Sequence, residues 1–119
     1  MEDTLSVKLN GEVLSIKMSY GLLNVLTRRI GDLEAVTDIF SDGHLQSDLL
    51  VEVFSKRGPR GEIVEEFNLF GSDLDSETVL SILEWIAEHV TDFFLKGLSK
   101  TKDLITEERR EMLRSLMPS

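Results

Sequence analysis

The residues that could do chemistry in this 119-residue chain are few, because it contains two histidines and no cysteine. The missing thiols exclude a disulfide framework, a thiolate nucleophile and a cysteine-ligated zinc site. His89 and Asp92 lie three positions apart, so on a helix they share a face and could meet at a metal ion. Because a single pair of this kind is common on solvated helices, we expect no metal site and no cofactor.

No pattern in the sequence indicates an enzyme. Order and spacing pick out no Ser–His–Asp constellation and no pair of carboxylates with an evident cleft, so we expect no catalytic residue. Residues 58–61 (Gly-Pro-Arg-Gly) form a basic loop with Lys56 and Arg57, but the Gly-Lys-Ser/Thr of a phosphate-binding loop is missing. Three acidic residues follow one another at four-residue spacing: Glu84, Glu88 and Asp92. On a helix they would form either a solvated face or a docking face for a basic partner.

Charge is distributed unevenly along the chain, whose 22 acidic and 13 basic residues give a net charge of −9. Residues 1–95 hold 7 basic and 18 acidic residues, a balance of −11, whereas residues 96–119 hold 6 and 4, a balance of +2. The acidic balance argues against binding to nucleic acid, and no apolar run approaches the roughly 18 residues of a membrane helix. With Glu2 and Asp3 in place of a basic signal-peptide start, we expect a soluble, cytoplasmic protein that binds no membrane.

The first element is predicted to be a β-hairpin. Residues 4–9 and 12–18 alternate apolar and polar side chains, and Asn10-Gly11 between them is typical of a two-residue turn. This turn pairs Leu9 with Glu12, Val7 with Leu14 and Leu5 with Ile16. The last two pairs are apolar and share one face, so pattern and turn agree on the register.

Two helices are expected next. Ser19 is a good N-cap for a helix over residues 20–30, and Gly31 is a good residue to close it. Asp32 caps a second, shorter helix through Phe40. We expect four of its side chains to point inward: Leu33, Val36, Ile39 and Phe40.

Residues 48–69 have two interpretations. The Gly-Pro-Arg-Gly sequence favours a turn, which predicts a second hairpin with Val53 opposite Phe67 and Val51 opposite Leu69. The alternative is a helix from His44 to Lys56, because the apolar residues after Asp48 also suit a helix face.

The C-terminal third is predicted to contain two helices. Asp75 or Ser76 caps a long amphipathic helix over about residues 77–98, and Thr106 caps a short helix over residues 106–117. The chain is thus predicted to be a single α+β domain, residues 1–119. Within it, residues 1–98 form an acidic α+β body and residues 99–119 a mildly basic helical tail.

The long helix is the strongest candidate for a binding surface. Its apolar side chains spread beyond the single stripe of Val79, Leu83, Ile86, Val90 and Phe93, so it is either deeply buried or half of an interface. A methionine-rich face on the last helix either covers it or binds a partner, a second copy of the chain being one option. The candidate protein-binding residues are Trp85, Phe94, Leu98, Met112, Leu116 and Met117.

Two stretches of sequence resemble proteins of bacteriophage tails. The hairpin VKLNGEVLSIK (residues 7–17), running into YGLLNVL (residues 20–26), resembles the small tail-assembly chaperones of long-tailed bacteriophages. LEWIAEHVTDFFLK (residues 83–96) is similar to a stretch of small phage tail-module proteins. The resemblance implies a non-enzymatic role in virion assembly, in which the protein binds the tape-measure protein or another tail protein in the host cytoplasm.

Two other functions agree with the same features. One is a structural component of the tail or baseplate that stays in the virion. The other is an acidic regulatory or inhibitory module that binds a basic protein.

Overall fold

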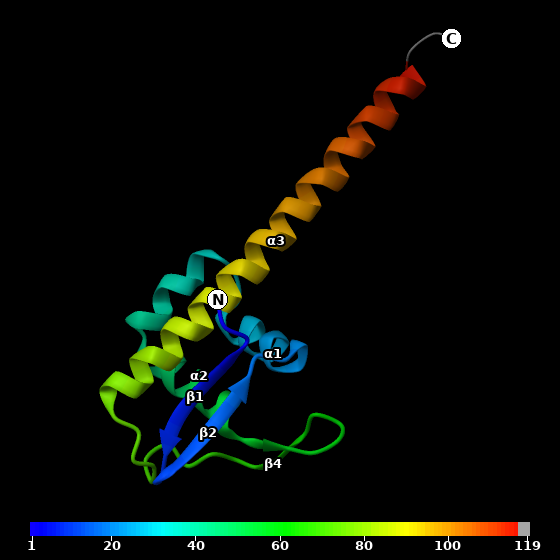
Figure 1. The fold of residues 1–119 in the computed structure, drawn as a ribbon. Helices are drawn as coiled ribbons and strands as arrows, with labels where there is room; N and C mark the ends of the chain where they lie inside the picture. Colours follow the sequence, from blue (N-terminus) through cyan, green and yellow to red (C-terminus); the bar gives the residue numbers. More distant parts are fainter. Residues whose placement is uncertain (117–119) are drawn as a thin grey trace.

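The long helix α3 (Ser76–Leu116) organises the molecule, and the remaining elements pack around its first half (Figure 1). The computed structural model describes residues 1–116 of a small single-domain α+β protein, as expected from the sequence. In chain order the other elements are β1 (Thr4–Leu9), β2 (Glu12–Lys17), α1 (Tyr20–Ile30), the 3-10 helix η1 (Glu34–Phe40), α2 (Gly43–Phe54), β3 (Lys56–Arg57) and β4 (Ile63–Glu65).

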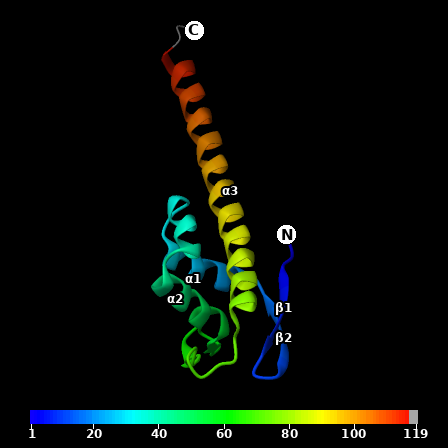
Figure 2. The same ribbon diagram turned by 90° about the vertical axis from the view of Figure 1, so that its left-hand side faces the viewer.

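The body has three layers, with the first half of α3 between the other two. Figure 2 shows the β1–β2 hairpin on one side of α3 and the helices α1 and α2 on the other. The core therefore takes side chains from every layer, with Val7 from the hairpin. Its fully buried members come from the helices and are Leu26, Ile39, Leu49, Ile82, Ile86 and Val90. Packing on both sides of one helix explains why this helix is apolar over more than one face.

The first hairpin forms with the predicted register. Leu9 pairs with Glu12, and the turn residues Asn10 and Gly11 have φ angles of 51° and 82°, as a two-residue turn of this kind requires. The Asn10 side chain accepts a hydrogen bond from the backbone N–H of Asp73, and the Asp73 carboxylate accepts one from the backbone N–H of Asn10. These reciprocal bonds join the hairpin turn to the segment that leads into α3.

The helix α1 is confirmed, with Ser19 as N-cap and Gly31 as the closing residue at φ 100°. The next segment is a 3-10 helix, which has three residues per turn. Val36 and Ile39, spaced by three, therefore share the face that packs toward the core, whereas Leu33 precedes the 3-10 helix and is only half-buried. The prediction that Phe40 also points inward is wrong, because a residue one position further falls on another side, where Phe40 is exposed.

The preferred interpretation of residues 48–69 is wrong in its first half. Residues 43–54 form the helix α2, close to the alternative helix, and not a strand that pairs Val51 and Val53 with residues 69 and 67. The Asp42 side chain caps this helix by accepting hydrogen bonds from the backbone N–H groups of His44 and Leu45. The cap and the burial of Leu49 and Leu50 outweigh the strand preference of the valines and phenylalanine.

The second hairpin exists, but it is shorter than predicted. Its strands β3 and β4 pair Lys56 with Glu65 and Arg57 with Ile63. The turn itself has the expected chemistry, since the Gly61 N–H donates to the Gly58 carbonyl and Gly61 has a φ of 81°. The chain then returns to α2, where the Phe54 and Phe67 rings pack 4.9 Å apart.

The two C-terminal helices expected from the sequence are one continuous helix of 41 residues, about 62 Å long. Thr106 does not cap a new helix, because its hydroxyl donates to the carbonyl of Lys102 inside the running helix. Thr101 donates in the same way to Gly97. Such bonds satisfy the hydroxyls locally, and no proline interrupts the segment, so the helix has no physical reason to stop.

The start of α3 is fixed by Asp75, one of the two predicted caps. The Asp75 carboxylate accepts a hydrogen bond from the backbone N–H of Thr78 at 2.7 Å. This bond lowers the pKa of Asp75, because it stabilises the ionised carboxylate. The cap therefore holds above the ordinary pKa of about 3.8 and is lost as the pH falls through the lower folded value.

One buried charge links three elements of the body. The side chain of Glu52 on α2 is only 5% exposed, and it forms ion pairs with Arg29 of α1 and Arg57 of β3. Hydrogen bonding to Glu52 raises the pKa of the Arg29 guanidinium, with the charge of Glu52 as the next cause. Both arginines are partly exposed, so they compensate the buried carboxylate while keeping contact with water.

The substitution Glu52→Gln tests this cluster, because it keeps the shape of the side chain and removes its charge. We expect the free energy of unfolding to fall by about 1.5–3 kcal/mol, the range for hydrogen bonds to charged groups. Glu65→Gln, which breaks the exposed pair with Lys56, is the matched control and should change it by less than about 1 kcal/mol. Urea unfolding measures both variants. If both lost the same free energy of unfolding, a structural role for the buried charge would be contradicted.

Candidate protein-binding site

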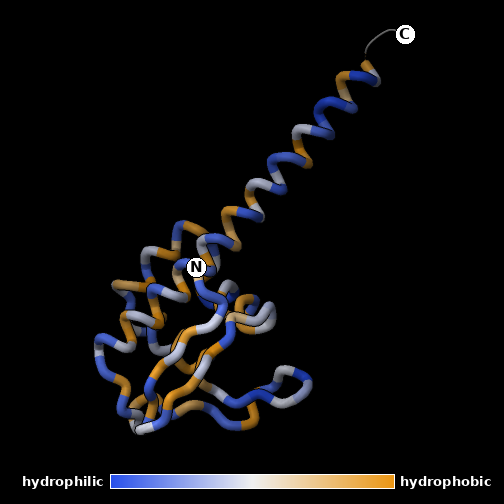
Figure 3. Tube along the Cα trace, viewed as in Figure 1, coloured by the Kyte–Doolittle hydropathy of each residue, from blue (hydrophilic) through white to orange (hydrophobic). Residues whose placement is uncertain are grey.

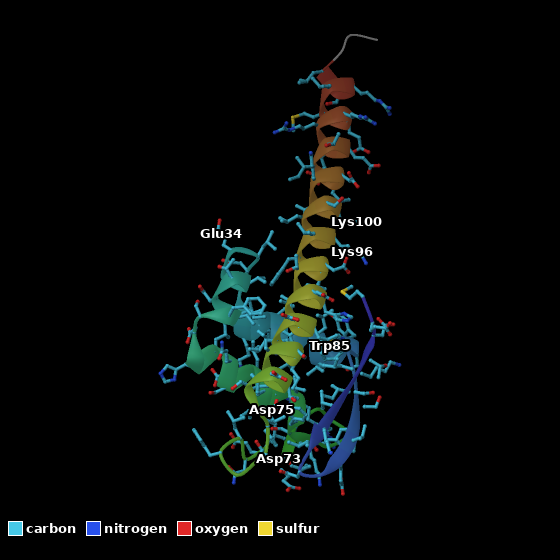
Figure 4. The ribbon with its side chains drawn as sticks, turned by 60° about the vertical axis from the view of Figure 1, so that its left-hand side comes forward. Glu34, Asp73, Asp75, Trp85, Lys96 and Lys100 are labelled. Atoms are coloured by element: carbon cyan, nitrogen blue, oxygen red, sulfur yellow. The ribbon has the colours of Figure 1, made fainter. Side chains whose placement is uncertain are left out.

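Trp85, one of the predicted binding residues, lies in the core and is 5% exposed. Its indole Nε1–H donates to the backbone carbonyl of Glu2 at 2.8 Å, and His89 Nε2 lies 2.7 Å from the same oxygen. Figure 4 shows Trp85 between α3 and the N-terminal strand. The N-terminal segment of this chain therefore covers Trp85, which is not available to a partner.

The histidine and the acidic residues of α3 form no metal site. His89 is buried against the Glu2 carbonyl, whereas Asp92 pairs with Lys96 at 2.9 Å. Among residues 1–116, no group of three potential ligands is close enough to hold a metal ion. Glu84 and Glu88 are exposed on the outer side of α3, as a solvated face requires.

The second half of α3 leaves the body and forms an arm, defined here as residues 99–116 (Figure 1). The molecule is accordingly elongated, measuring 72 × 32 × 24 Å. Every described residue from Leu95 onward is exposed. Figure 3 shows that hydrophobic positions recur along the arm between hydrophilic ones. A helix with apolar side chains and nothing packed on them is a candidate for binding another protein.

The continuity of α3 places four of the predicted binding residues on one face. Phe94 and Met112 are separated by eighteen positions, about five full turns, and the same holds for Leu98 and Leu116. Ile105 lies midway, and all five fall within about 40° of one another around the helix axis. We call these five the docking face: Phe94, Leu98, Ile105, Met112 and Leu116. The sixth predicted residue, Met117, lies outside the described residues.

The body end of the docking face opens into a groove where α3 leaves the body. This junction groove has a volume of about 560 Å³ and lies between the segment 31–34 and residues 93–101 of α3. Phe94 and Leu98 line it, so groove and docking face form one continuous surface. Asp32 and Glu34 supply the acidic side, and Figure 4 shows Glu34 level with Lys96 and Lys100 along α3.

The junction groove also contains a glycine that the fold does not need. Gly97 lies within α3, where glycine lowers helix stability by about 1 kcal/mol relative to alanine. A Cβ at this position would meet nothing within 4 Å, so close packing inside the chain does not explain the glycine. Without a side chain here, the surface of the helix is open to the backbone of a binding partner.

Two of the three basic residues in the basic loop are paired with carboxylates. Arg57 is paired with Glu52, and Lys56 lies 3.3 Å from Glu65. The exposed positive charge of the described chain is instead most concentrated along α3 beyond Asp92, where the described residues include six lysines and arginines: Lys96, Lys100, Lys102, Arg109, Arg110 and Arg114.

Comparison with known protein families, with curated proteins and with solved structures finds no match to this chain. Among residues 1–116, no helix combines the length and the apolar character that crossing a bilayer requires.

Sequence reasoning missed two parts of this site. Ile105 lies between the two predicted helices, residues 77–98 and 106–117, although its seven-residue spacing from Leu98 and Met112 is a signal for a shared helical face. The acidic residues Asp32 and Glu34 reach the groove only because η1 packs beside α3, and no local pattern predicts that contact.

Two isoleucines of the same helix test the division between body and arm. Ile86 is fully buried and Ile105 is 46% exposed. We expect Ile86→Ala to lower the free energy of unfolding by about 2–5 kcal/mol, because it leaves a cavity in the core. Ile105→Ala should change it by less than about 0.5 kcal/mol. Denaturant unfolding at low protein concentration measures both, and a large loss at Ile105 would mean that the arm packs on the body.

Proposed function

We propose that the chain is a non-enzymatic assembly factor that binds another protein through the docking face of α3. The observation that carries this proposal is the continuation of α3 beyond the body, where four exposed apolar side chains extend the face that begins at the half-buried Phe94. A folded protein rarely leaves such a row uncovered unless it binds something. The junction groove extends the row into a partly enclosed site with polar groups at its side.

The geometry suits an α-helix of a partner as the bound element. The docking face is straight, narrow and about 33 Å long from Phe94 to Leu116, which is the shape of a helix–helix contact. The partner helix would bury its own apolar stripe on these residues. A basic residue near one end of that helix would meet Asp32 and Glu34 at the groove.

The acidic body gives the complex a second property. Residues 1–95 carry a balance of −11, from 7 basic and 18 acidic residues. A net charge of this size keeps a protein and its bound client in solution, because like-charged complexes repel one another. An apolar face on a strongly charged body is the arrangement expected of a factor that holds aggregation-prone helices.

The specific client we propose is a tail protein of a long-tailed bacteriophage, with the tape-measure protein first. The basis is the sequence resemblance of residues 7–26 and 83–96 to small tail-assembly and tail-module proteins. In that role the chain acts in the host cytoplasm and leaves before the particle is complete. The long, helix-rich client would present many apolar stripes to the docking face.

Co-expression tests this function. The chain is produced with the tape-measure protein of the same genome, and we expect it to keep that protein in the soluble fraction and to co-purify with it. The double variant L98D/M112D should lose both effects, whereas L104D, exposed on another side of the arm, should retain them. If the tape-measure protein were equally soluble with and without this chain, the proposal that the chain keeps its client in solution would be refuted.

Two further observations separate the alternatives. A gene that lies outside any phage tail module would remove the basis for a tape-measure client. Mass spectrometry of purified particles should lack the chain. Finding it there in fixed amounts would make it a structural component of the tail.

A further inference from the structure

We propose that a second copy of this chain occupies the docking face, with the two α3 helices antiparallel. This goes beyond the proposed function, because it needs no client and can be tested on the purified chain. The same face would serve both roles, so a client helix would replace the second copy by mass action.

The spacing of the docking face carries the proposal. Its residues follow one another at steps of four, seven, seven and four, which is the same series in either direction along the chain. An antiparallel pair centred on Ile105 therefore aligns every member with another member. Phe94 lies opposite Leu116 of the second copy, Leu98 opposite its Met112, and Ile105 opposite its Ile105. This self-matching order is what a two-fold symmetric interface requires.

The positions around the helix agree with close packing in this arrangement. Phe94 and Met112 lie on one side of the centre line of the docking face, and Leu98 and Leu116 lie on the other. Each opposed pair therefore joins a side chain from one side with a side chain from the other. Such pairs interdigitate between the helices and avoid meeting head on.

Charge decides the direction of the pair. A parallel pair would bring two bodies, each with a balance of −11, to the same end. The antiparallel pair places them at opposite ends and puts the mildly basic arms between them. The end of each docking face then lies beside the junction groove of the other copy, because Leu116 and Met112 lie opposite Phe94 and Leu98, which line that groove.

Two features make the contact between the copies weak enough for a client helix to replace the second copy. The contact rests on five apolar side chains per copy and leaves the body surfaces free. Lys102 also falls on the same flank as Arg109 of the second copy, and like charges at that separation weaken the contact. A pair of moderate stability covers the apolar row in the absence of a client and releases it when one is present.

Cysteine crosslinking tests the arrangement directly, because the natural chain has no cysteine and each introduced thiol is the only one present. With a short bismaleimide we expect Ile105→Cys to give a covalent dimer. Leu98→Cys mixed with Met112→Cys should also give a dimer, whereas Leu98→Cys alone should not, since the two thiols lie about 21 Å apart in the antiparallel pair. Leu104→Cys, on another side of the arm, is the matched control.

Light scattering gives the second readout. The molar mass should rise with concentration from 13.5 kDa toward twice that value, and Ile105→Asp should hold it at the monomer mass while Leu104→Asp dimerises normally. A dimer from Leu98→Cys alone would overturn the antiparallel direction. Equal crosslinking at Leu104 would overturn the docking face as the contact, and a monomer from micromolar to millimolar concentration would overturn the second copy altogether. None of these results depends on the phage client.

Discussion

The packing of α3 between the hairpin and the helices α1 and α2 is the contact on which the rest of the structure depends. From Ile82 to Val90 most of its side chains are buried, and they supply half of the fully buried core. Neither outer layer could bury its apolar face without this helix, because a two-stranded hairpin is marginal in water by itself. Two hydrogen-bonded contacts hold the hairpin against the same helix. One joins the Trp85 indole to the Glu2 carbonyl, and the other joins Asn10 to Asp73.

The body packs against only the first half of α3, and this packing determines how the arm is oriented. The body fixes the direction of α3 and the angle around its axis, so the orientation of the arm is set by residues that do not belong to it. The docking face begins at Phe94, which still packs against the core, and continues to Leu116 in solvent. The apolar row is thus presented rigidly at its base, which reduces the entropy that a partner must overcome on binding.

Charge adds a second constraint to the same architecture. The acidic residues are concentrated in the body, where the buried Glu52 is matched by two arginines and most others face water. The basic residues are concentrated along the arm. In the proposed antiparallel pair, this separation of charge places the two acidic bodies at opposite ends.

The parts of the fold that the sequence predicted are those specified by neighbouring residues. Asn10-Gly11 and the alternation around it predicted the hairpin and its register, and Ser19 and Gly31 predicted the limits of α1. The helix α2 was the second choice from the sequence, because its valines and phenylalanine also suit a strand and its packing against α1 is not a local feature. Glu52 was missed for the same reason, since its partners come from two other elements.

The candidate site shows the same division. The sequence predicted apolar binding residues near both ends of the docking face, but Thr106-Glu107-Glu108 looked like the start of a new helix. Because a helix boundary was predicted there, the sequence did not show that Leu98 and Leu116 share one face of a continuous helix. Trp85 was misplaced because its burial depends on the Glu2 carbonyl, 83 positions earlier in the chain.

Hydrogen–deuterium exchange along α3 shows whether the arm is free to bind a partner, because it measures helix protection residue by residue. We expect slow exchange from Ile82 to Val90 at every protein concentration. Over the arm we expect fast exchange in dilute solution and marked protection as the concentration rises. Strong protection of the arm in the most dilute sample would contradict an exposed docking face, because the arm would then be covered by its own body and unavailable to any partner.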